Sequence, residues 1–301
     1  MSNDLSKALQ SLEGLSTGDA FGELFFTISP HHTSPAHLPK TIWRWTDDTH
    51  MALSIVEVLK RYGHIEQDAL ARAFAERYQE EPYRGYGGGA ARLLRQVASG
   101  SDWRTISPTL FGTGSYGNGA AMRVAPLGGF FYQDLQQVVK EAHLSSVITH
   151  AHPEGQAGAI AVAVAAAIAA NTPCPSGREF LHEIVKLVPE SATKKGIQLA
   201  LTIPANELLQ AVTVLGSGSN VSAQDTVPFC LWSAAYHLNN YEKALWQTAK
   251  GLGDCDTTCA IVGGIVSLSA KEIPLAWLKQ RELLPVLQHY SPQRTLRGAY
   301  A

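Results

Sequence analysis

The sequence has little charge, and almost no excess of one sign over the other. Its 301 residues include 24 lysines and arginines and 26 aspartates and glutamates, which gives a formal net charge of −2. Long-range attraction therefore gives no reason to expect a nucleic acid or a membrane surface as a partner. An anionic ligand would have to be held by local groups.

Cysteine is also scarce, with four residues at positions 174, 230, 255 and 259. These spacings are not those of a zinc ribbon, and a chain of this length forms a core without disulfides. We expect reduced thiols in the core. The first residues, MSNDLSKALQ, lack the basic and apolar segments of a secretion signal, so we expect a cytoplasmic protein.

No apolar run is long enough to span a bilayer. The longest candidate, AGAIAVAVAAAIAA at 157–170, falls short of the roughly 20 residues that a transmembrane helix needs. Most of its residues are alanine, whose small side chain lets a helix pack closely against its neighbours. The sequence predicts a buried helix here.

The alternating pattern of a β-strand is also nearly absent, the best candidate being the short segment GGFFYQ at 128–133. Gly63 and Gly216 occupy positions typical of helix C-caps, and Pro228 suits the first turn of a helix. We predict a single compact all-α domain over 1–301, with 290–300 as a polar tail. Helical spacing of apolar residues recurs in six segments: 5–15, 51–63, 135–148, 178–188, 197–203 and 207–216.

The segment WRWTDDTH at 43–50 places two carboxylates where a helix begins. Thr46 is a good N-cap residue, and the helix dipole favours Asp47 and Asp48 in the first turn. A simple acidic cap is therefore one interpretation. Neighbouring helical residues point about 100° apart, so this pair alone does not enclose one ion.

A second cluster, GDCDTTCAIVGG, favours a metal site over two unrelated caps. Asp254 and Asp256 precede Thr257 and another small-residue helix. Four carboxylates facing one space repel each other unless a cation neutralises them. Oxygen ligands indicate a hard ion, Mg²⁺, Mn²⁺ or Ca²⁺. We therefore predict that the two clusters converge.

Glycine-rich loops are the other unusual feature, at 83–90, 112–123 and 216–220. Alternate glycines in GSYGNG let backbone amides approach a ligand, and such amides bind phosphate oxygens without a lysine. A plain turn-rich loop is the alternative interpretation. Tyr83 and Tyr86 are candidates for stacking on an adenine.

Seven motifs in this order resemble the ADP-ribosylglycohydrolase family, over residues 12 to 270. The resemblance implies an all-α fold whose cleft holds a binuclear centre of two Mg²⁺ or Mn²⁺ ions. The motifs are GDAFG (18–22), WTDDTHMAL (45–53), RGYGGGA (84–90), GSYGNGAAMRVAPLG (114–128), ITHAHPEG (148–155), DTVPFCLWS (225–233) and GDCDTTCAIVGG (253–264).

The resemblance also implies which residues form the site. The implied metal ligands are Thr46, Asp47, Asp48, Asp254, Asp256 and Thr257. The implied contacts to the diphosphate and distal ribose are Gly114, Ser115, Tyr116, Gly117, Asn118, Gly119, Met122 and His150.

The implied activity is hydrolysis of the glycosidic bond between the distal ribose of ADP-ribose and a protein or small-molecule acceptor. We expect the ions to bind the ribose hydroxyls and the attacking water, and Asp47 and Asp48 to serve catalysis, with Asp48 accepting the proton of the water. We expect the loop at 27–41 to lie at the mouth of the cleft.

One position departs from the family pattern GDxxGxxxE, because Phe26 replaces the glutamate. Glu23 lies one helical turn earlier, either as a substitute catalytic carboxylate or as a solvated side chain. Two alternative functions therefore stay open: an ADP-ribose-binding protein with weak or no activity, and a metal-dependent phosphohydrolase that cuts the diphosphate.

Overall fold

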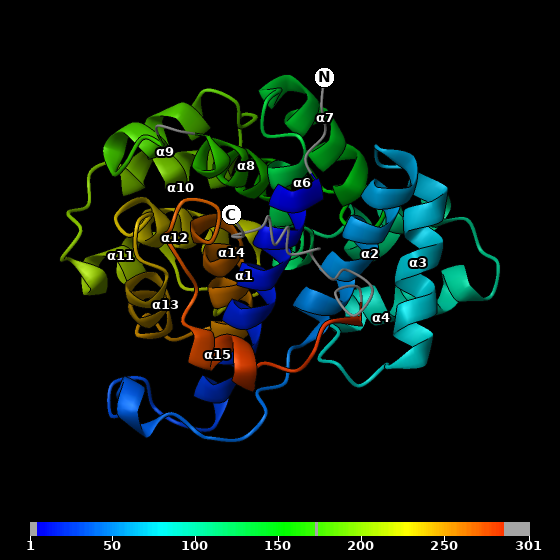
Figure 1. The fold of residues 1–301 in the computed structure, drawn as a ribbon. Coiled ribbons are helices and arrows are strands. Elements are labelled where there is room, and N and C mark those ends of the chain that lie inside the picture. The colour runs from blue at the N-terminus through cyan, green and yellow to red at the C-terminus, as the bar shows by residue number, and fades with distance from the viewer. Residues whose placement is uncertain (1–4, 172–173, 286–301) are drawn as a thin grey trace, which may run out of the picture.

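A computed structural model of the chain describes residues 5–171 and 174–285, and these ranges form a compact assembly of helices (Figure 1). The described residues contain two isolated β-bridges and no strand, which confirms the all-α prediction. The segment 290–300, predicted as a tail, lies outside the described residues.

The α-helices are α1 (Leu5–Glu23), α2 (Asp47–Tyr62), α3 (Gln67–Glu80), α4 (Gly88–Ala98), α5 (Trp103–Ile106), α6 (Ala125–Phe130), α7 (Leu135–Ser146), α8 (Pro153–Ala170), α9 (Arg178–Val185), α10 (Ala192–Ala200), α11 (Leu208–Leu215), α12 (Ala223–Ala235), α13 (Tyr241–Ala249), α14 (Cys255–Val266) and α15 (Leu275–Gln280). Four short 3₁₀ turns are η1 (Leu24–Phe26), η2 (Pro35–His37), η3 (Ser107–Gly112) and η4 (Asn118–Ala120).

The most extensive contact between two helices in the described residues is that of α1 with α14, which lie side by side near the centre of Figure 1. Gly14, Gly18 and Gly22 recur every four residues and therefore form one stripe along α1. A Cβ on Gly18 would lie 2.1 Å from the carbonyl oxygen of Cys259, and one on Gly22 would lie 2.1 Å from that of Cys255. Only glycine allows the two backbones to approach this closely.

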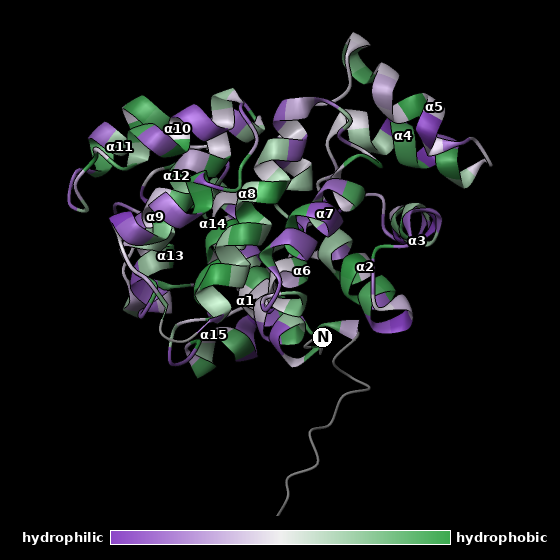
Figure 2. Ribbon diagram, turned by 90° about the horizontal axis from the view of Figure 1, so that it is seen from above, coloured by the Kyte–Doolittle hydropathy of each residue, from purple (hydrophilic) through white to green (hydrophobic). Residues whose placement is uncertain are grey.

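The helix α8 is the buried helix predicted at 157–170, and Figure 2 shows its apolar ribbon among the other helices. The helix begins at Pro153, earlier than the predicted run, and by length and composition alone it is the one helix among residues 5–171 and 174–285 that could cross a membrane. Because 83% of it is buried inside the protein, it is a core helix as predicted. Gly128 of α6 would meet the carbonyl oxygen of Ala163 at 2.1 Å if it carried a Cβ. Small side chains thus let α6 pack tightly on α8.

Several local predictions are confirmed and two are wrong. Gly63 and Gly216 are C-cap residues with positive φ. The segment 128–133 is no strand, because it ends α6 and continues into a turn. Pro228 lies inside α12 rather than in its first turn, since the helix begins five residues earlier. Gly196 of α10 makes room for its ring.

The four cysteines are unpaired, as predicted. Cys230, Cys255 and Cys259 are buried, and Cys174 is only half-buried.

We predict that Gly18→Ala lowers the free energy of unfolding by about 2 kcal/mol or more, because the added methyl meets a carbonyl oxygen of α14 that cannot move without separating the helices. Urea denaturation measures this change. Gly88→Ala is the control, since a Cβ there meets nothing within 4 Å; helix propensity predicts that it is neutral or stabilising by up to about 1 kcal/mol. Equal stabilities of the two variants would contradict the packing argument.

Candidate active site

Asp19 of α1 fixes the start of α2. Its carboxylate is fully buried and accepts hydrogen bonds from the backbone N–H groups of Thr46 (2.9 Å) and Thr49 (3.1 Å) and from both threonine hydroxyls (2.9 and 2.5 Å). Burial raises the pKa of Asp19 to about 6, and these hydrogen bonds oppose the rise. The sequence showed Asp19 in a motif but gave no sign of this role.

Thr46 stands at the N-cap of α2, as predicted, but its hydroxyl makes no capping hydrogen bond. The Oγ1 atom lies 2.9 Å from Oδ1 of Asp19 and 3.0 Å from Oδ2 of Asp48. Thr46 therefore links two buried carboxylates, which a simple acidic cap does not explain.

The second cluster lies at the start of α14. The amide of Asn118 donates to Oδ2 of Asp254 at 2.7 Å and to the hydroxyl of Thr226 at 3.1 Å. The backbone N–H of Thr257 donates to Oδ1 of Asp256 at 2.8 Å. Asn118 thus ties the glycine-rich loop 114–119 to the second aspartate cluster.

The two clusters meet in one cavity of about 440 Å³, within the usual range for small-molecule sites. The cavity contains both aspartate pairs and most of the predicted ligand loop. Its lining is Asp47, Asp48, Met51, Gly85, Gly87, Gly88, Gly89, Ala90, Phe111, Ser115, Tyr116, Gly117, Asn118, Gly119, Met122, His150, Val221, Asp254, Asp256 and Thr257.

The carboxylates of this cavity lie in an unfavourable electrostatic environment. Burial, reinforced by the charges of Asp19 and Asp254, raises the pKa of Asp47 to about 8. Burial and the neighbouring aspartates also raise the pKa of Asp48 and of Asp256 well above the usual range. Such carboxylates favour a proton or a cation nearby.

These residues fit a hard cation by their chemistry. Oδ1 of Asp48 is buried without a hydrogen-bond partner, so this oxygen has a lone pair to offer. The polar side-chain atoms of the six predicted ligands, Thr46, Asp47, Asp48, Asp254, Asp256 and Thr257, are all oxygens, which hard cations prefer. In the part of the chain that the structure describes, no three His, Cys, Asp or Glu side chains are already gathered closely enough to form a ligand group.

Other predicted residues lie outside this lining. Gly114 has a φ of +86°, and a Cβ added there would lie 2.6 Å from the backbone N of His152. Only glycine therefore fits at this position of the loop. His152 caps α8 by accepting a hydrogen bond from the N–H of Glu154. Tyr83 and Tyr86, proposed to stack on an adenine, do not line this cavity. Tyr83 instead lines a neighbouring cavity, and stacking of either tyrosine on an adenine stays a prediction.

Tyr83 is almost fully exposed. The hydroxyl of Tyr86 shares a hydrogen bond with Nδ1 of His50 at 2.9 Å. Among the described residues, Phe111, Tyr116 and His150 line the cavity with aromatic rings. Phe111 has a positive φ of 54°, which the sequence pattern did not indicate.

The helix α4 was also missed, because GGGA at 87–90 resembles a loop in the sequence. The structure begins α4 at Gly88, and its first turn lines the cavity. The first N–H groups of a helix have no intrahelical acceptor and attract anions. Among the described residues no lysine or arginine lines the cavity, so these N–H groups are the positive groups that α4 offers there.

A neighbouring cavity of about 670 Å³ shares Gly85 and Asp256 with the first and is also lined by Thr46 and Glu23. Glu23 is half-buried, and burial raises its pKa. Phe26, at the family's glutamate position, is 55% exposed. The loop 27–41, expected at the cleft mouth, lines neither cavity.

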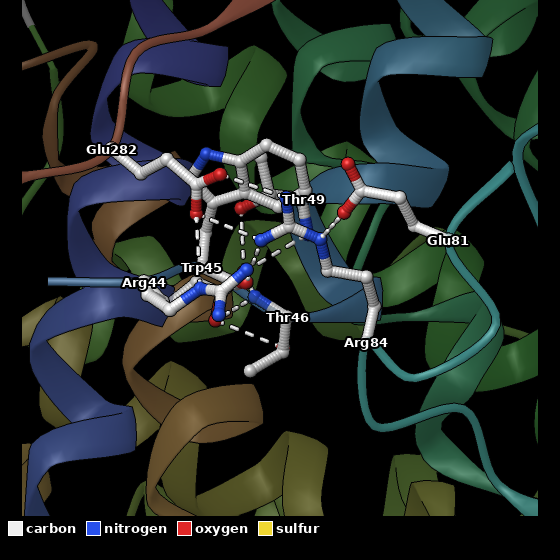
Figure 3. A network of polar contacts seen from close by, with 8 residues as sticks. Arg44, Trp45, Thr46, Thr49, Glu81, Arg84 and Glu282 are labelled. Atoms are coloured by element: carbon white, nitrogen blue, oxygen red, sulfur yellow. Dashed lines mark hydrogen bonds and ion pairs between the residues drawn. The ribbon is translucent and has the colours of Figure 1, made fainter.

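A network of hydrogen bonds around Arg84, the Arg84 network, connects the start of α2 to the segment that follows α15 (Figure 3). The Nη1 and Nη2 atoms of Arg84 each lie 2.8 Å from a carboxylate oxygen of Glu282, its Nε bonds Glu81, and its guanidinium lies 3.7 Å from the ring centre of Trp45. Its backbone oxygen accepts a hydrogen bond from the N–H of Asp47 at 2.7 Å. The Arg84 network therefore supports the first residue of α2.

The family model of the ADP-ribosylglycohydrolases matches residues 1–297. The chain belongs to the ADP-ribosylglycohydrolase family. The fold and the motif order found here are thus those of a known family, as the sequence resemblance predicted.

Relatives support this membership. A protein of Archaeoglobus fulgidus is 29% identical over 291 aligned residues, covering 91% of this chain and 92% of its own. The ADP-ribosylhydrolase ARH3 of Gallus gallus is 28% identical, covering 77% and 72%, and that of Homo sapiens is 27% identical, covering 85% and 79%. A solved structure titled ADP-ribosylglycohydrolase-related protein complex has a TM-score of 0.66 at 20% identity, covering 92% of this chain and 93% of its own.

For this member of the family we predict that Glu282→Ala lowers the free energy of unfolding by about 2 kcal/mol, because it leaves the buried Arg84 guanidinium without its two-point partner. Chemical denaturation measures the change. Glu190→Ala is the control, because the Glu190 side chain pairs with Lys194 and is 83% exposed. We expect it to lower the free energy of unfolding by less than about 0.5 kcal/mol. Similar losses in both variants would contradict a special role for the Arg84 network.

Proposed function

We propose that this protein is a metal-dependent hydrolase that removes ADP-ribose from an ADP-ribosylated acceptor by cleaving the glycosidic bond at the distal ribose. The observation that carries the proposal is the single cavity in which four carboxylates face a glycine-rich loop. Membership of the family and the likeness to ADP-ribosylhydrolases ARH3 support the substrate class.

In this proposal the oxygens of Asp47, Asp48, Asp254, Asp256, Thr46 and Thr257 hold two Mg²⁺ or Mn²⁺ ions. Such ions, when bound, supply a positive field that orients sugar hydroxyls and lowers the pKa of bound water. Thr46 contacts Asp19 and Asp48 and so keeps the carboxylate of Asp48 in place. Asp48 then accepts the proton of the attacking water.

The opposite wall of the cavity binds the diphosphate and the nucleoside. Amides of the loop 114–119 and of the first turn of α4 are the donors for phosphate oxygens, because none of the described residues that line the cavity has a cationic side chain. Phe111 and Tyr116, which are 71% and 47% exposed, offer ring faces for the adenine.

Glu23 approaches the reacting bond from the neighbouring cavity, which we assign to the acceptor. The two cavities share Asp256, so a bond cleaved at the aspartates lies between them. The raised pKa of Glu23 favours a protonated carboxyl that donates to the leaving acceptor.

The exposed Phe26 favours a second candidate, an ADP-ribose-binding protein with little or no turnover. Phenylalanine supplies neither a metal ligand nor a proton donor at the family's glutamate position. This candidate uses the same cavity and the same ions, and differs only in the absence of hydrolysis.

The test is product analysis by liquid chromatography and mass spectrometry, with Mg²⁺ or Mn²⁺ and a panel of ADP-ribosylated acceptors. We expect intact ADP-ribose, released only with metal, and a loss of kcat/KM of about 10²–10³-fold in Asp48→Asn because a group at the reacting centre is lost. Glu183→Gln is the control, since its carboxylate is exposed on α9 and is expected to keep full activity.

Other products separate the alternatives. AMP and ribose phosphate would instead indicate a phosphohydrolase. Metal-dependent binding of ADP-ribose with no release from any acceptor would favour the binding protein. If release occurs, an unchanged kcat in Glu23→Gln would contradict the role assigned to Glu23.

A further inference from the structure

Arg123 is a fully buried cation that the proposed chemistry does not use. It follows the loop at the cavity and lies in the core, with its guanidinium 4.4 Å from the ring centre of Phe74. No carboxylate forms an ion pair with it in residues 5–171 or 174–285. Its hydrogen bonds go to Sδ of Met51 (3.5 Å), the carbonyl oxygen of Ser145 (3.2 Å) and Oγ1 of Thr149 (2.9 Å).

Thr149 connects this cation to the cavity. Its hydroxyl is buried and has two neighbours, Nη2 of Arg123 at 2.9 Å and Nδ1 of His150 at 2.7 Å. A guanidinium only donates, so Oγ1 of Thr149 accepts from Arg123. The hydrogen of the same hydroxyl is then free to be donated to one acceptor.

The only acceptor in contact with that hydrogen, among the described residues, is Nδ1 of His150. In the opposite tautomer Nδ1 would carry a hydrogen of its own, and the hydroxyl hydrogen of Thr149 would be buried without a partner, which is unfavourable. The contacts therefore select the tautomer of His150 with its hydrogen on Nε2. Burial and the charge of Arg123 lower the pKa of His150 to about 3, so the ring is neutral.

Nε2 of His150 faces the glycine-rich loop. A Cβ added to Gly117 would lie 3.3 Å from Nε2, and one added to Gly119 would lie 3.2 Å from it. His150 lines the cavity, and no hydrogen bond within the described part of the chain uses Nε2. This nitrogen is therefore directed to the place where the loop meets a ligand.

We infer that Arg123 and Thr149 are positioning residues that fix the tautomer of His150, so that Nε2 presents an N–H donor to an oxygen of bound ADP-ribose. The other tautomer would turn a nitrogen lone pair toward that oxygen and repel it. Arg123 acts through Thr149 and does not touch the ligand. The identity of the ligand rests on the proposed function, whereas the tautomer does not.

The tautomer is measured on the ligand-free full chain by long-range ¹H–¹⁵N correlation spectra of protein labelled with ¹⁵N-histidine. His150→Gln identifies the signals of His150 by their loss. We expect a pyrrole-like Nε2 and a pyridine-like Nδ1 at neutral pH. A pyrrole-like Nδ1, or a charged ring, would overturn the inference without the need for any further variant.

Thr149→Val removes the hydroxyl at nearly constant volume, and Thr149→Ser retains it as the matched control. We expect Thr149→Val to shift His150 toward the other tautomer and to weaken ADP-ribose binding about tenfold by calorimetry with Mg²⁺, the size expected for one hydrogen bond to a charged group. Thr149→Ser is expected to keep the wild-type tautomer and to bind within about threefold. Wild-type spectra and affinity in Thr149→Val would overturn the inference.

The experiments distinguish a failure of the proposed function from a failure of the tautomer assigned to His150. If the wild-type protein shows the expected tautomer but does not bind ADP-ribose, the proposed function is contradicted and the arrangement of Arg123, Thr149 and His150 stands. If ADP-ribose binds and is released while Nδ1 carries the hydrogen, the function stands and the assigned role of Arg123 and Thr149 is overturned.

Discussion

The close contact of α1 with α14 is the constraint on which the rest of the site depends. Three glycines let the backbones touch, and the contact brings the end of α1 against the start of α14. Asp19, on the same part of α1, holds the start of α2 through four hydrogen bonds. One helix therefore places both aspartate clusters. Asn118 adds the glycine-rich loop to the same assembly through Asp254.

Without a bound ion, the buried carboxylates of the site lower the stability of the folded protein. Several carboxylates are buried near one another, and their pKa values rise because burial and mutual repulsion oppose ionisation. The structure offsets part of this cost with threonine hydroxyls, with backbone N–H groups and with the positive ends of α2 and α14. The Arg84 network adds a rigid support at Asp47. The cation that we propose to bind here would relieve the repulsion between these carboxylates.

Apolar spacing and caps are local signals, and the six segments that they predicted overlap α1, α2, α7, α9, α10 and α11, whereas α3 and α13 were not predicted. The sequence also predicted the two aspartate clusters, since each stands at a helix start. It could not predict α4, because GGGA has low helix propensity and the surroundings decide its conformation. The role of Asp19 and the relation between Arg123 and His150 depend on contacts between distant segments. Pro228 inside α12 depends on the space left by Gly196 in another helix.

The central claim is that the carboxylates at the starts of α2 and α14 bind two divalent cations side by side. The most direct measurement is a crystal structure of the protein grown with Mn²⁺, with anomalous diffraction collected above the manganese absorption edge. We expect two anomalous peaks in the cavity, from ions held by Asp47 and Asp48 on one side and by Asp254 and Asp256 on the other. No peak in the cavity, or peaks elsewhere on the protein only, would contradict the claim.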